Sequence, residues 1–384
     1  AKEYEHYNSP MANDDRADAP GSDTICSIEV KKMLTDKTIL VTGGTGSLGK
    51  VLIKRLLTGE MGCPKKIIVF SRDEAKQHFM RMEYLNRAAA TDEVIYNNFK
   101  RMLEFRIGDV RDFHSVSRAL RGVDVVFNTA ALKQVPSCEY FPFEAVLTNI
   151  TGPENIVRAI REQNLPIDTV VGISTDKACK PVNVMGMTKA IQERIFIQAN
   201  LDCPNTRFIC VRYGNVLASR GSVIPLFHDQ ILNGGPVTIT TPEMTRFLLS
   251  LDQAVDTIFA AVRYASRGET YIPRVPSAKV TDIAATLIGD RPIRMTVTGI
   301  RPGEKIHEIL VSEEEAHRTI SRGKYYVIQP ILPELRGEAD FGPALGVEYS
   351  SADNLMTRDE LRDELHRHGL LLDDLEKNKG ELIR

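Results

Sequence analysis

Three polar residues that could take part in acid–base chemistry follow one another directly after an apolar run. The β-branched run 169–173 predicts a strand buried on both faces, as in parallel sheets. Thr175, Asp176 and Lys177 come just after it, so we expect them at the carboxyl end of this strand. Open α/β sheets bind their ligands at that edge. A hydroxyl, a carboxylate and an amine are therefore predicted to meet where a ligand would bind.

A second amine is expected close to the first three groups. Pro181 and Asn183 indicate a turn, and the composition of 185–199 predicts a helix after it. On that helix Met185 and Lys189 are one turn apart and share a face. The whole stretch 174–190, STDKACKPVNVMGMTKA, therefore reads as a catalytic loop and the helix that follows it.

A glycine-rich turn lies between the first expected strand, 37–41, and the helix expected over 50–57. Glycine also serves ordinary turns, which is the alternative interpretation. At a strand-to-helix junction, however, G-x-x-G-x-x-G is typical of a loop that holds a pyrophosphate on the helix N-terminus. The residues expected to line this dinucleotide site are Gly43, Thr45, Gly46, Ser47, Leu48 and Gly49.

The end of the second expected strand, 66–70, favours NADP over NAD. An NAD site usually offers a carboxylate to the ribose 2′-hydroxyl. Here the strand runs into Ser71, Arg72 and Asp73. The Arg72 guanidinium can pair with a 2′-phosphate, and the Ser71 hydroxyl can donate to it. A shift of the expected register by one or two residues would instead bring Asp73 to the ribose.

Further cofactor contacts are expected after the next two strands, 103–108 and 123–127. Asp109, with Val110 beside it, either accepts a hydrogen bond from the adenine amino group or caps the following helix. Ala130 and Ala131 are small enough for the backbone to approach a nicotinamide ribose closely. Lys133 follows at the same sheet edge and is a candidate for contact with a substrate hydroxyl or phosphate.

Strands and helices alternate from Thr38 to Tyr213, which predicts an α/β fold with a doubly wound, Rossmann-type parallel sheet. After Tyr213 the segments are shorter and mixed, which indicates a smaller α/β substrate domain. We expect an N-terminal tail over 1–34, the dinucleotide-binding domain over 35–215 with 245–265 returning to it, the substrate domain over 216–355 and a helical tail over 356–384.

Arginines in the loops of the second half suggest a substrate that carries a diphosphate. Planar guanidinium groups match phosphate oxygens well. The alternative for each is a solvated surface arginine or the partner of a carboxylate. The candidates, with a phosphate role favoured for the last three, are Arg212, Arg220, Arg246 and Arg301.

Composition excludes several classes of function. The 49 basic and 51 acidic side chains give a net charge of −2, which offers no electrostatic reason to bind nucleic acid. We expect no membrane span and no signal peptide, and hence a cytoplasmic protein. The cysteines show no spacing typical of zinc ligands, so we expect free thiols and no metal site at Cys26, Cys63, Cys138, Cys179, Cys203 and Cys210.

Several motifs together resemble the extended short-chain dehydrogenase/reductase superfamily and, within it, the UDP-N-acetylglucosamine 4,6-dehydratases. The resemblance covers about 35–355 and is greatest to the soluble members, which often invert carbon 5. It implies bound NADP, a UDP-sugar substrate and a homo-oligomer. The motifs are TGGTGSLG (42–49), FSRDE (70–74), AALKQVP (130–136), STDKA (174–178), RYGNV (212–216), SRGSVIP (219–225), MTRF (244–247) and RPGEK (301–305).

The resemblance also implies a role for each site residue. Hydride leaves carbon 4 of the sugar for NADP, a base takes the carbon 5 proton, an acid assists departure of the carbon 6 hydroxyl, and hydride returns to carbon 6. Lys177 would be the base, Asp176 the acid, and Thr175 the partner of the carbon 4 oxygen. Such a cycle needs an amine of lowered pKa. The substrate contacts would include Lys133, Asn215, Arg220, Arg246, Arg301 and Glu304.

The sequence departs from the superfamily at one position. The Y-x-x-x-K motif places a tyrosine four residues before the lysine, but Met185 stands there. Lys189 can still bind the nicotinamide ribose, while the base for oxidation at carbon 4 becomes Lys177 or a water relayed through Thr175. The alternatives are a dehydratase that retains configuration, a nucleotide-sugar 4-epimerase, or a catalytically silent NADP-binding scaffold.

Overall fold

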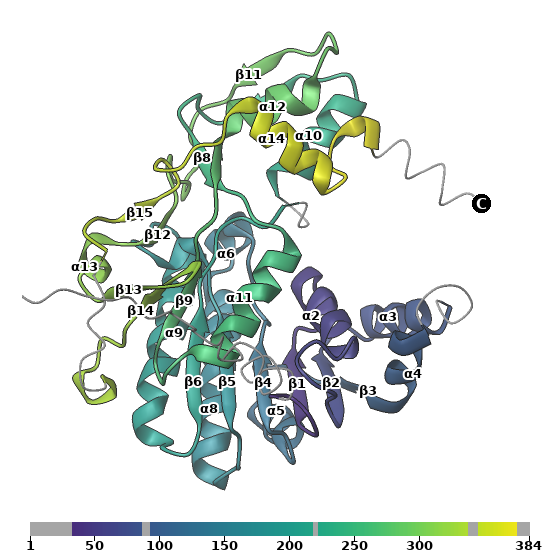
Figure 1. Cartoon of the computed structure of the whole chain (residues 1–384), viewed down its shortest axis with the longest axis vertical. Helices are drawn as coiled ribbons and strands as arrows, with labels where there is room; N and C mark the ends of the chain where they lie inside the picture. The colour runs from purple at the N-terminus through teal and green to yellow at the C-terminus, as the bar shows by residue number, and fades with distance from the viewer. Residues whose placement is uncertain (1–32, 87–92, 218–221, 337–344, 375–384) are drawn as a thin grey trace, which may run out of the picture.

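The computed structural model describes residues 33–86, 93–217, 222–336 and 345–374. Its main feature is a nine-stranded sheet with the order β13-β14-β9-β6-β5-β4-β1-β2-β3 (Figure 1). The strands β9, β6, β5, β4, β1, β2 and β3 run parallel to one another, and β14 and β13 add an antiparallel edge next to β9. The strands are β1 Thr38–Thr42, β2 Lys66–Ser71, β3 Leu103–Ile107, β4 Val125–Asn128, β5 Thr169–Ile173, β6 Arg207–Val211, β9 Thr270–Pro273, β13 Thr319–Arg322 and β14 Tyr325–Ile328.

The parallel sheet is covered by helices on both faces, and this burial explains its apolar strands. All residues of β4 and β5 are buried. One apolar cluster joins the sheet to α2 and α11, and a second joins it to α5, α8 and α9. The helices of this region are α2 Ser47–Leu57, α3 Glu74–Asn86, α4 Glu93–Met102, α5 Phe113–Leu120, α6 Val135–Tyr140, α7 Pro142–Val146, α8 Gly152–Gln163, α9 Val184–Asp202 and α11 Leu251–Tyr264.

A smaller unit with its own apolar core packs above the carboxyl edge of the large sheet (Figure 1). It contains the two-stranded sheets β8–β10 and β7–β11. Its helices are α10 Val223–Leu232, α12 Val280–Ile288 and α14 Arg358–Arg367, and its strands are β7 Val237–Ile239, β8 Thr245–Phe247, β10 Ser277–Lys279 and β11 Met295–Val297. A third strand pair, β12 Ile309–Val311 with β15 Tyr349–Ser350, and the short helix α13 Glu313–Ala316 pack into the apolar core of the large sheet.

The predicted fold class is confirmed, with differences in particular elements. Strands β9, β13 and β14 come from the range 216–355 yet belong to the large sheet, so residue 215 does not mark the end of that sheet. Helix α11 contacts α2 and the sheet, as expected for 245–265. Apolar spacing predicts a helix over 143–162 that is interrupted by Gly152 and Pro153; the structure divides this range into α7, a π-helical turn at Leu147–Thr151, and α8, which begins at Gly152. The sequence analysis did not foresee α4, α10 or the β13–β14 hairpin.

A buried ion-pair network connects the large sheet to β12 and α13. Arg212, just after β6, is 2% exposed. Its guanidinium donates to Glu193 of α9 at 2.6 and 3.0 Å and to Glu315 of α13 at 2.7 and 3.0 Å. It also donates to the Leu310 carbonyl at 2.8 Å. Arg212 is therefore a structural residue that holds β12 and α13 against the sheet.

We expect Arg212→Ala to lower the free energy of unfolding by about 3–5 kcal/mol, because it leaves two buried carboxylates without their cation. Arg161→Ala is the matched control. Arg161 pairs with Asp202 at 2.9 Å, but the two side chains are 42% and 31% exposed, so its loss should cost about 0–1 kcal/mol. Urea unfolding curves measure both, and equal midpoints for the two variants would contradict the structural role.

Candidate active site

The candidate catalytic residues lie in one short turn at the carboxyl end of β5. Asp176 to Ala178 form a single 3-10 turn, which Thr175 begins by accepting a hydrogen bond from the Lys177 N–H. The turn is fixed from both sides. Its Asp176 N–H donates to the Tyr213 carbonyl at 3.0 Å, and α9 packs so closely that a Cβ on Gly186 would lie 2.1 Å from the Lys177 carbonyl oxygen.

Within this turn, hydroxyl, carboxylate and amine form a continuous chain of hydrogen bonds. The Thr175 hydroxyl donates to Asp176 Oδ1 at 2.8 Å, and Lys177 Nζ donates to the same oxygen at 3.0 Å. Asp176 is fully buried, whereas the Lys177 side chain is 18% exposed. The structure therefore brings together the three groups predicted from the sequence, with Thr175 and Lys177 on the accessible side of the carboxylate.

A fourth buried group, Glu308, was not foreseen. Glu308 Oε1 lies 3.2 Å from Lys177 Nζ and 3.9 Å from Arg246 Nε. Glu308 Oε2 and Asp176 Oδ2 are both buried and have no hydrogen-bond partner among the described residues. Glu308 follows the RPGEK motif by three residues, but nothing local in the sequence places it beside Lys177.

The pKa values of Asp176 and Lys177 are both raised, but for different reasons. Burial raises the pKa of Asp176, and the charge of Glu308 raises it further, against the effect of Lys177. Burial alone would lower the pKa of Lys177, but the charges of Asp176 and Glu308 outweigh burial and raise it. The expected amine of lowered pKa is therefore not Lys177. Burial lowers the pKa of Lys189 to about 8.

Lys189 and Met185 lie on α9 below the catalytic turn. Lys189 Nζ donates to the Ile173 carbonyl at 2.5 Å and to Gln192 Oε1 at 2.7 Å. Met185 is 4% exposed and packs with Cys138 and Ala145 in a small apolar cluster. Met185 therefore fills space, and Lys189 is held by a carbonyl and an amide in place of a tyrosine.

The glycine turn after β1 has the geometry of a dinucleotide cradle. Gly43 has a φ of +65°, and a Cβ there would lie 2.8 Å from the Ala130 backbone. A Cβ on Gly49 would lie 2.6 Å from Gly44 Cα, so α2 starts directly against the turn. Gly46 precedes α2 and caps it with no side chain, which leaves the first helical N–H groups to an anion. These features fit a pyrophosphate.

At the end of β2 the expected ribose contacts can now be placed. Ser71 is buried, and its hydroxyl lies 3.2 Å from the hydroxyl of Thr45. The Arg72 side chain is 58% exposed and its guanidinium lies 3.8 Å from Asp109. Asp73 accepts a hydrogen bond from the Lys76 N–H at 2.9 Å, so its carboxylate is occupied at the start of α3. Of these three residues, Arg72 is therefore the one whose charged group is most exposed at the end of β2.

Asp109 does not cap the helix that follows it, so that alternative was wrong. The cap of α5 is Asp112, which accepts from the N–H groups of His114 and Ser115. Asp109 instead pairs with Arg111 at 2.7 Å, which helps to hold its pKa low. Val110, next to it, is buried against Gly152.

The loop that carries Ala130, Ala131 and Lys133 is held by Asn149, another residue that the sequence analysis did not assign to the site. Asn149 accepts from the Leu132 N–H at 2.8 Å and donates to the Leu132 carbonyl at 2.9 Å. It lies in the π-helical turn, a distortion that is frequent at functional sites. Ala131 and Lys133 are exposed at the sheet edge.

The remaining predicted substrate residues are only partly gathered at the site. Arg246, on β8, is buried and donates to the Thr245 carbonyl at 2.7 Å. Glu304 is half-buried and accepts from Thr240 at 3.3 Å. Arg301 is exposed, Asn215 has a buried Oδ1 without a partner among the described residues, and Arg220 lies outside the described residues. The RPGEK loop reaches the site, since Asn183 donates to the Gly303 carbonyl at 2.7 Å.

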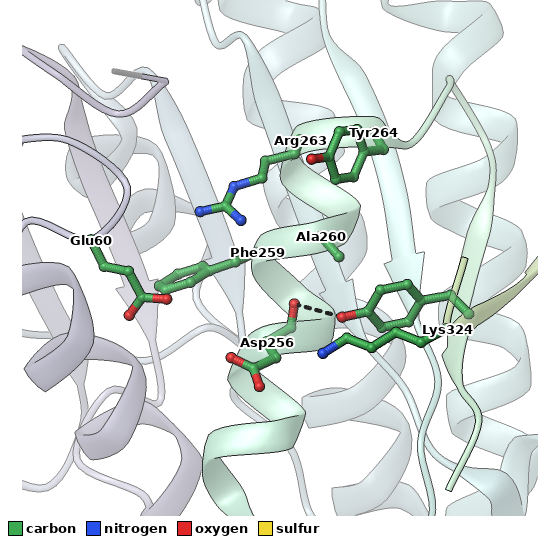
Figure 2. A pocket seen from close by; sticks show the side chains of 8 residues that line it. Glu60, Asp256, Phe259, Ala260, Arg263, Tyr264 and Lys324 are labelled. Carbon is green, nitrogen blue, oxygen red and sulfur yellow. Dashed lines mark hydrogen bonds between the residues drawn. The ribbon is translucent and has the colours of Figure 1, made fainter. Parts of the chain in front are cut away.

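A separate cavity of about 260 Å³ lies on the outer face of α11 (Figure 2). Its walls include Glu60, Asp256, Phe259, Arg263 and Lys324, and Figure 2 shows these side chains around the open space. No predicted site residue lines it. The candidate active site is therefore the catalytic turn and the glycine turn at the carboxyl edge, not this cavity.

The part of the chain that the structure describes has neither a cluster of metal ligands nor a membrane-spanning helix. No group of three or more His, Cys, Asp or Glu side chains there is placed to hold a metal ion. No helix of that part is both long enough and apolar enough to cross a membrane. The cysteines in this part of the chain are free thiols, and Cys26 lies outside it.

The chain is similar to several known proteins. The pattern of the family described as "Polysaccharide biosynthesis protein" matches residues 39–330. A UDP-glucose 4-epimerase of Rickettsia bellii is 43% identical over 301 residues, which cover 77% of this chain and 84% of the relative. The structure of Pen from Bacillus thuringiensis is 34% identical with a TM-score of 0.78, covering 88% of this chain and 99% of the other.

A more distant structure shows the fold alone. The dTDP-glucose 4,6-dehydratase DesIV from Streptomyces venezuelae, solved with NAD and TYD bound, is 20% identical with a TM-score of 0.57. The alignment covers 70% of this chain and 86% of that one. From the match over 39–330 and the glycine cradle on a parallel sheet, the chain belongs to the polysaccharide biosynthesis protein family and has the fold of the extended short-chain dehydrogenase/reductases.

Proposed function

We propose that this protein is an NADP-dependent UDP-N-acetylglucosamine 4,6-dehydratase that inverts carbon 5. The observation that carries the proposal is the buried, hydrogen-bonded pair of Asp176 and Lys177 at the carboxyl edge of β5. Elimination of water needs both a base for a carbon-bound proton and an acid for the leaving hydroxyl. Epimerisation at carbon 4 needs no acid for a leaving group, so the acid of this pair, Asp176, would have no role in it.

The Thr175 hydroxyl offers a route for the proton lost on oxidation at carbon 4, which the absent tyrosine would otherwise take. Thr175 donates to Asp176 at 2.8 Å. A proton from the carbon 4 hydroxyl can therefore pass to Thr175 while Thr175 passes its own to Asp176. Because Asp176 is fully buried, exchange through this half-buried hydroxyl also explains how the carboxyl reaches the sugar. Bound nicotinamide would supply the hydride chemistry, taking hydride from carbon 4 and returning it to carbon 6.

Elimination then uses both members of the pair. Neutral Lys177 takes the proton from carbon 5, which the carbon 4 ketone has made acidic. Asp176 returns its proton, through Thr175, to the carbon 6 oxygen, which leaves as water as the carbon 5–carbon 6 double bond forms. For carbon 5 to be inverted, solvent water protonates it on the face opposite Lys177 as carbon 6 is reduced, and the Lys177 ammonium releases its proton to solvent. Lys177 is neutral and Asp176 ionised at both ends of the cycle, so protons balance and only water is lost.

NADP is favoured by the residues after β2. Arg72 extends an exposed guanidinium there, and Asp73 is occupied by the start of α3. The solved neighbour from Streptomyces venezuelae was obtained with NAD, so the family fold accommodates a nicotinamide dinucleotide. The product would be UDP-2-acetamido-2,6-dideoxy-4-hexulose, a precursor for surface glycans. The homo-oligomer and the cytoplasmic location remain predictions.

A nucleotide-sugar 4-epimerase is the second candidate, because relatives 43% identical to this chain are named UDP-glucose 4-epimerases. Met185 weighs against it, since an epimerase of this superfamily relies on the tyrosine that is missing here. The two reactions differ in a simple way: the epimerase product keeps its carbon 6 hydroxyl and the mass of the substrate.

Incubation with UDP-N-acetylglucosamine in deuterated water should give a product lighter by one water, with solvent deuterium at carbon 5. The deuterium arises because solvent protonates carbon 5 on the face opposite Lys177. Mass spectrometry and NMR of the product measure both, and coupling constants assign the configuration. A product of unchanged mass, including an epimer at carbon 4, would refute the dehydratase.

Lys177→Met and Asp176→Asn should each reduce dehydration by about 10²–10⁴-fold, the range for loss of a general acid or base. The two variants should differ in the absorbance of reduced cofactor that forms during a single turnover. Lys177→Met should still accumulate reduced cofactor, because oxidation uses Thr175 and Asp176, whereas Asp176→Asn should not. Lys180→Met, which removes an amine paired with Glu348 nearby, is the control and should be unaffected. Loss of the reduced-cofactor signal in Lys177→Met would make Lys177 the oxidation base instead.

Arg72→Ala should weaken NADP binding by about 10–150-fold with little effect on NAD, because a charge-assisted hydrogen bond to phosphate contributes about 1.5–3 kcal/mol. Titration of both cofactors by fluorescence or calorimetry gives the ratio. Arg81→Ala, at an exposed position further along α3, is the control, because it removes a positive charge that is not among the predicted cofactor contacts. An equal change in the affinities for NADP and NAD in Arg72→Ala would show that Arg72 does not bind the 2′-phosphate.

A further inference from the structure

Glu308 is a buried carboxylate beside the catalytic pair that the proposed steps do not use. It is 2% exposed. Its Oε1 lies 3.2 Å from Lys177 Nζ and 3.9 Å from Arg246 Nε, and its Oε2 has no partner among the described residues. Lys177 thus lies between two carboxylates, Asp176 from its own turn and Glu308 from a distant part of the chain.

The backbone around Glu308 is held firmly, so its side chain has a fixed direction. The Glu308 N–H donates to the Ser351 hydroxyl at 2.9 Å, and the Ser351 N–H donates to the Glu308 carbonyl at 2.8 Å. Two residues further on, the Leu310 carbonyl accepts from Arg212. The elements that place Glu308 are therefore β15, β12 and the buried network below the catalytic turn.

The negative charge of Glu308 balances positive charges that are buried around Lys177. The buried cluster contains two anions, Asp176 and Glu308, and two cations, Lys177 and Arg246. Lys305 adds its charge at the edge, where its amine donates to the Cys179 carbonyl. An isolated buried charge is costly, and removal of one partner leaves the other uncompensated. Without Glu308 the cluster would hold an excess positive charge beside Lys177.

The two carboxyl groups are also pushed apart in pKa. Burial would raise the pKa of both, but the charges of Lys177, Arg246 and Lys305 bring that of Glu308 below its ordinary value. The pKa of Asp176 stays raised. The raised pKa suits the Asp176 carboxyl group to exchange protons, whereas the lowered pKa keeps the Glu308 carboxyl group ionised.

We propose that Glu308 is a positioning residue for dehydration, a permanent counter-ion that holds the Lys177 amine against Asp176 and favours its ammonium form. This inference rests on the proposed dehydratase function, in which neutral Lys177 takes the carbon 5 proton. It predicts that activity rises with pH as Lys177 loses its proton, and that Glu308 sets the position of this rise.

The test is the pH dependence of kcat for dehydration of UDP-N-acetylglucosamine. Glu308→Gln removes an anion that favours the ammonium, so the pKa of Lys177 falls and the rising limb moves to lower pH by about 1–3 units. Arg246→Met removes a cation that disfavours the ammonium, so the limb should move to higher pH. Glu308→Asp keeps the charge and should keep the limb near the wild-type position, with a lower plateau.

Glu313→Gln is the matched control, since that side chain is 71% exposed, and its profile should equal the wild type. A purely structural role would lower the plateau of Glu308→Gln without moving the limb, and that result would overturn the inference. Opposite shifts in Glu308→Gln and Arg246→Met would support it.

If Glu308→Gln does not fold, an unmoved limb in Arg246→Met overturns it alone. If the wild-type protein releases no water, the function itself is refuted, which is a distinct outcome.

Discussion

The site depends on one buried ion cluster, in which the Lys177 amine lies between the carboxylates of Asp176 and Glu308. Burial makes each charge costly alone, so each is retained because the others are present. The cluster also ties together parts of the chain that no local interaction would join. Asp176 and Lys177 come from the end of β5, Arg246 comes from β8 and Glu308 from the residues before β12. The cluster is therefore complete only when these three parts of the chain are packed together.

Close backbone packing gives this cluster its precision. Gly186 lets α9 approach the Lys177 carbonyl, and Gly214 lets Phe247 lie beside Asp176. Beneath them Arg212 joins α9 to α13 through buried ion pairs. A parallel sheet supplies the rest, because the carboxyl ends of β1 and β5 meet at one edge. The glycine cradle and the catalytic turn thus face the same space.

Much of the fold could be predicted because its strands are continuous apolar runs and its turns contain glycine at positions that require it. The site could be predicted only where its residues are neighbours in sequence, as in Thr175, Asp176 and Lys177. Glu308 was missed because its contact with Lys177 is tertiary. Arg212 was considered for phosphate binding because an arginine at a strand end has the same local pattern whether it faces a ligand or buried carboxylates.

Met185 shows how the sequence and the structure complement each other. The sequence shows that a proton carrier is missing, and the structure shows a chain from Thr175 to Asp176 that could replace it. The central claim is that hydride leaves carbon 4 and returns to carbon 6 within one molecule. The most direct measurement uses substrate with deuterium at carbon 4 and locates the label by NMR. The account predicts deuterium in the new carbon 6 methyl group, whereas deuterium found again at carbon 4 would contradict it.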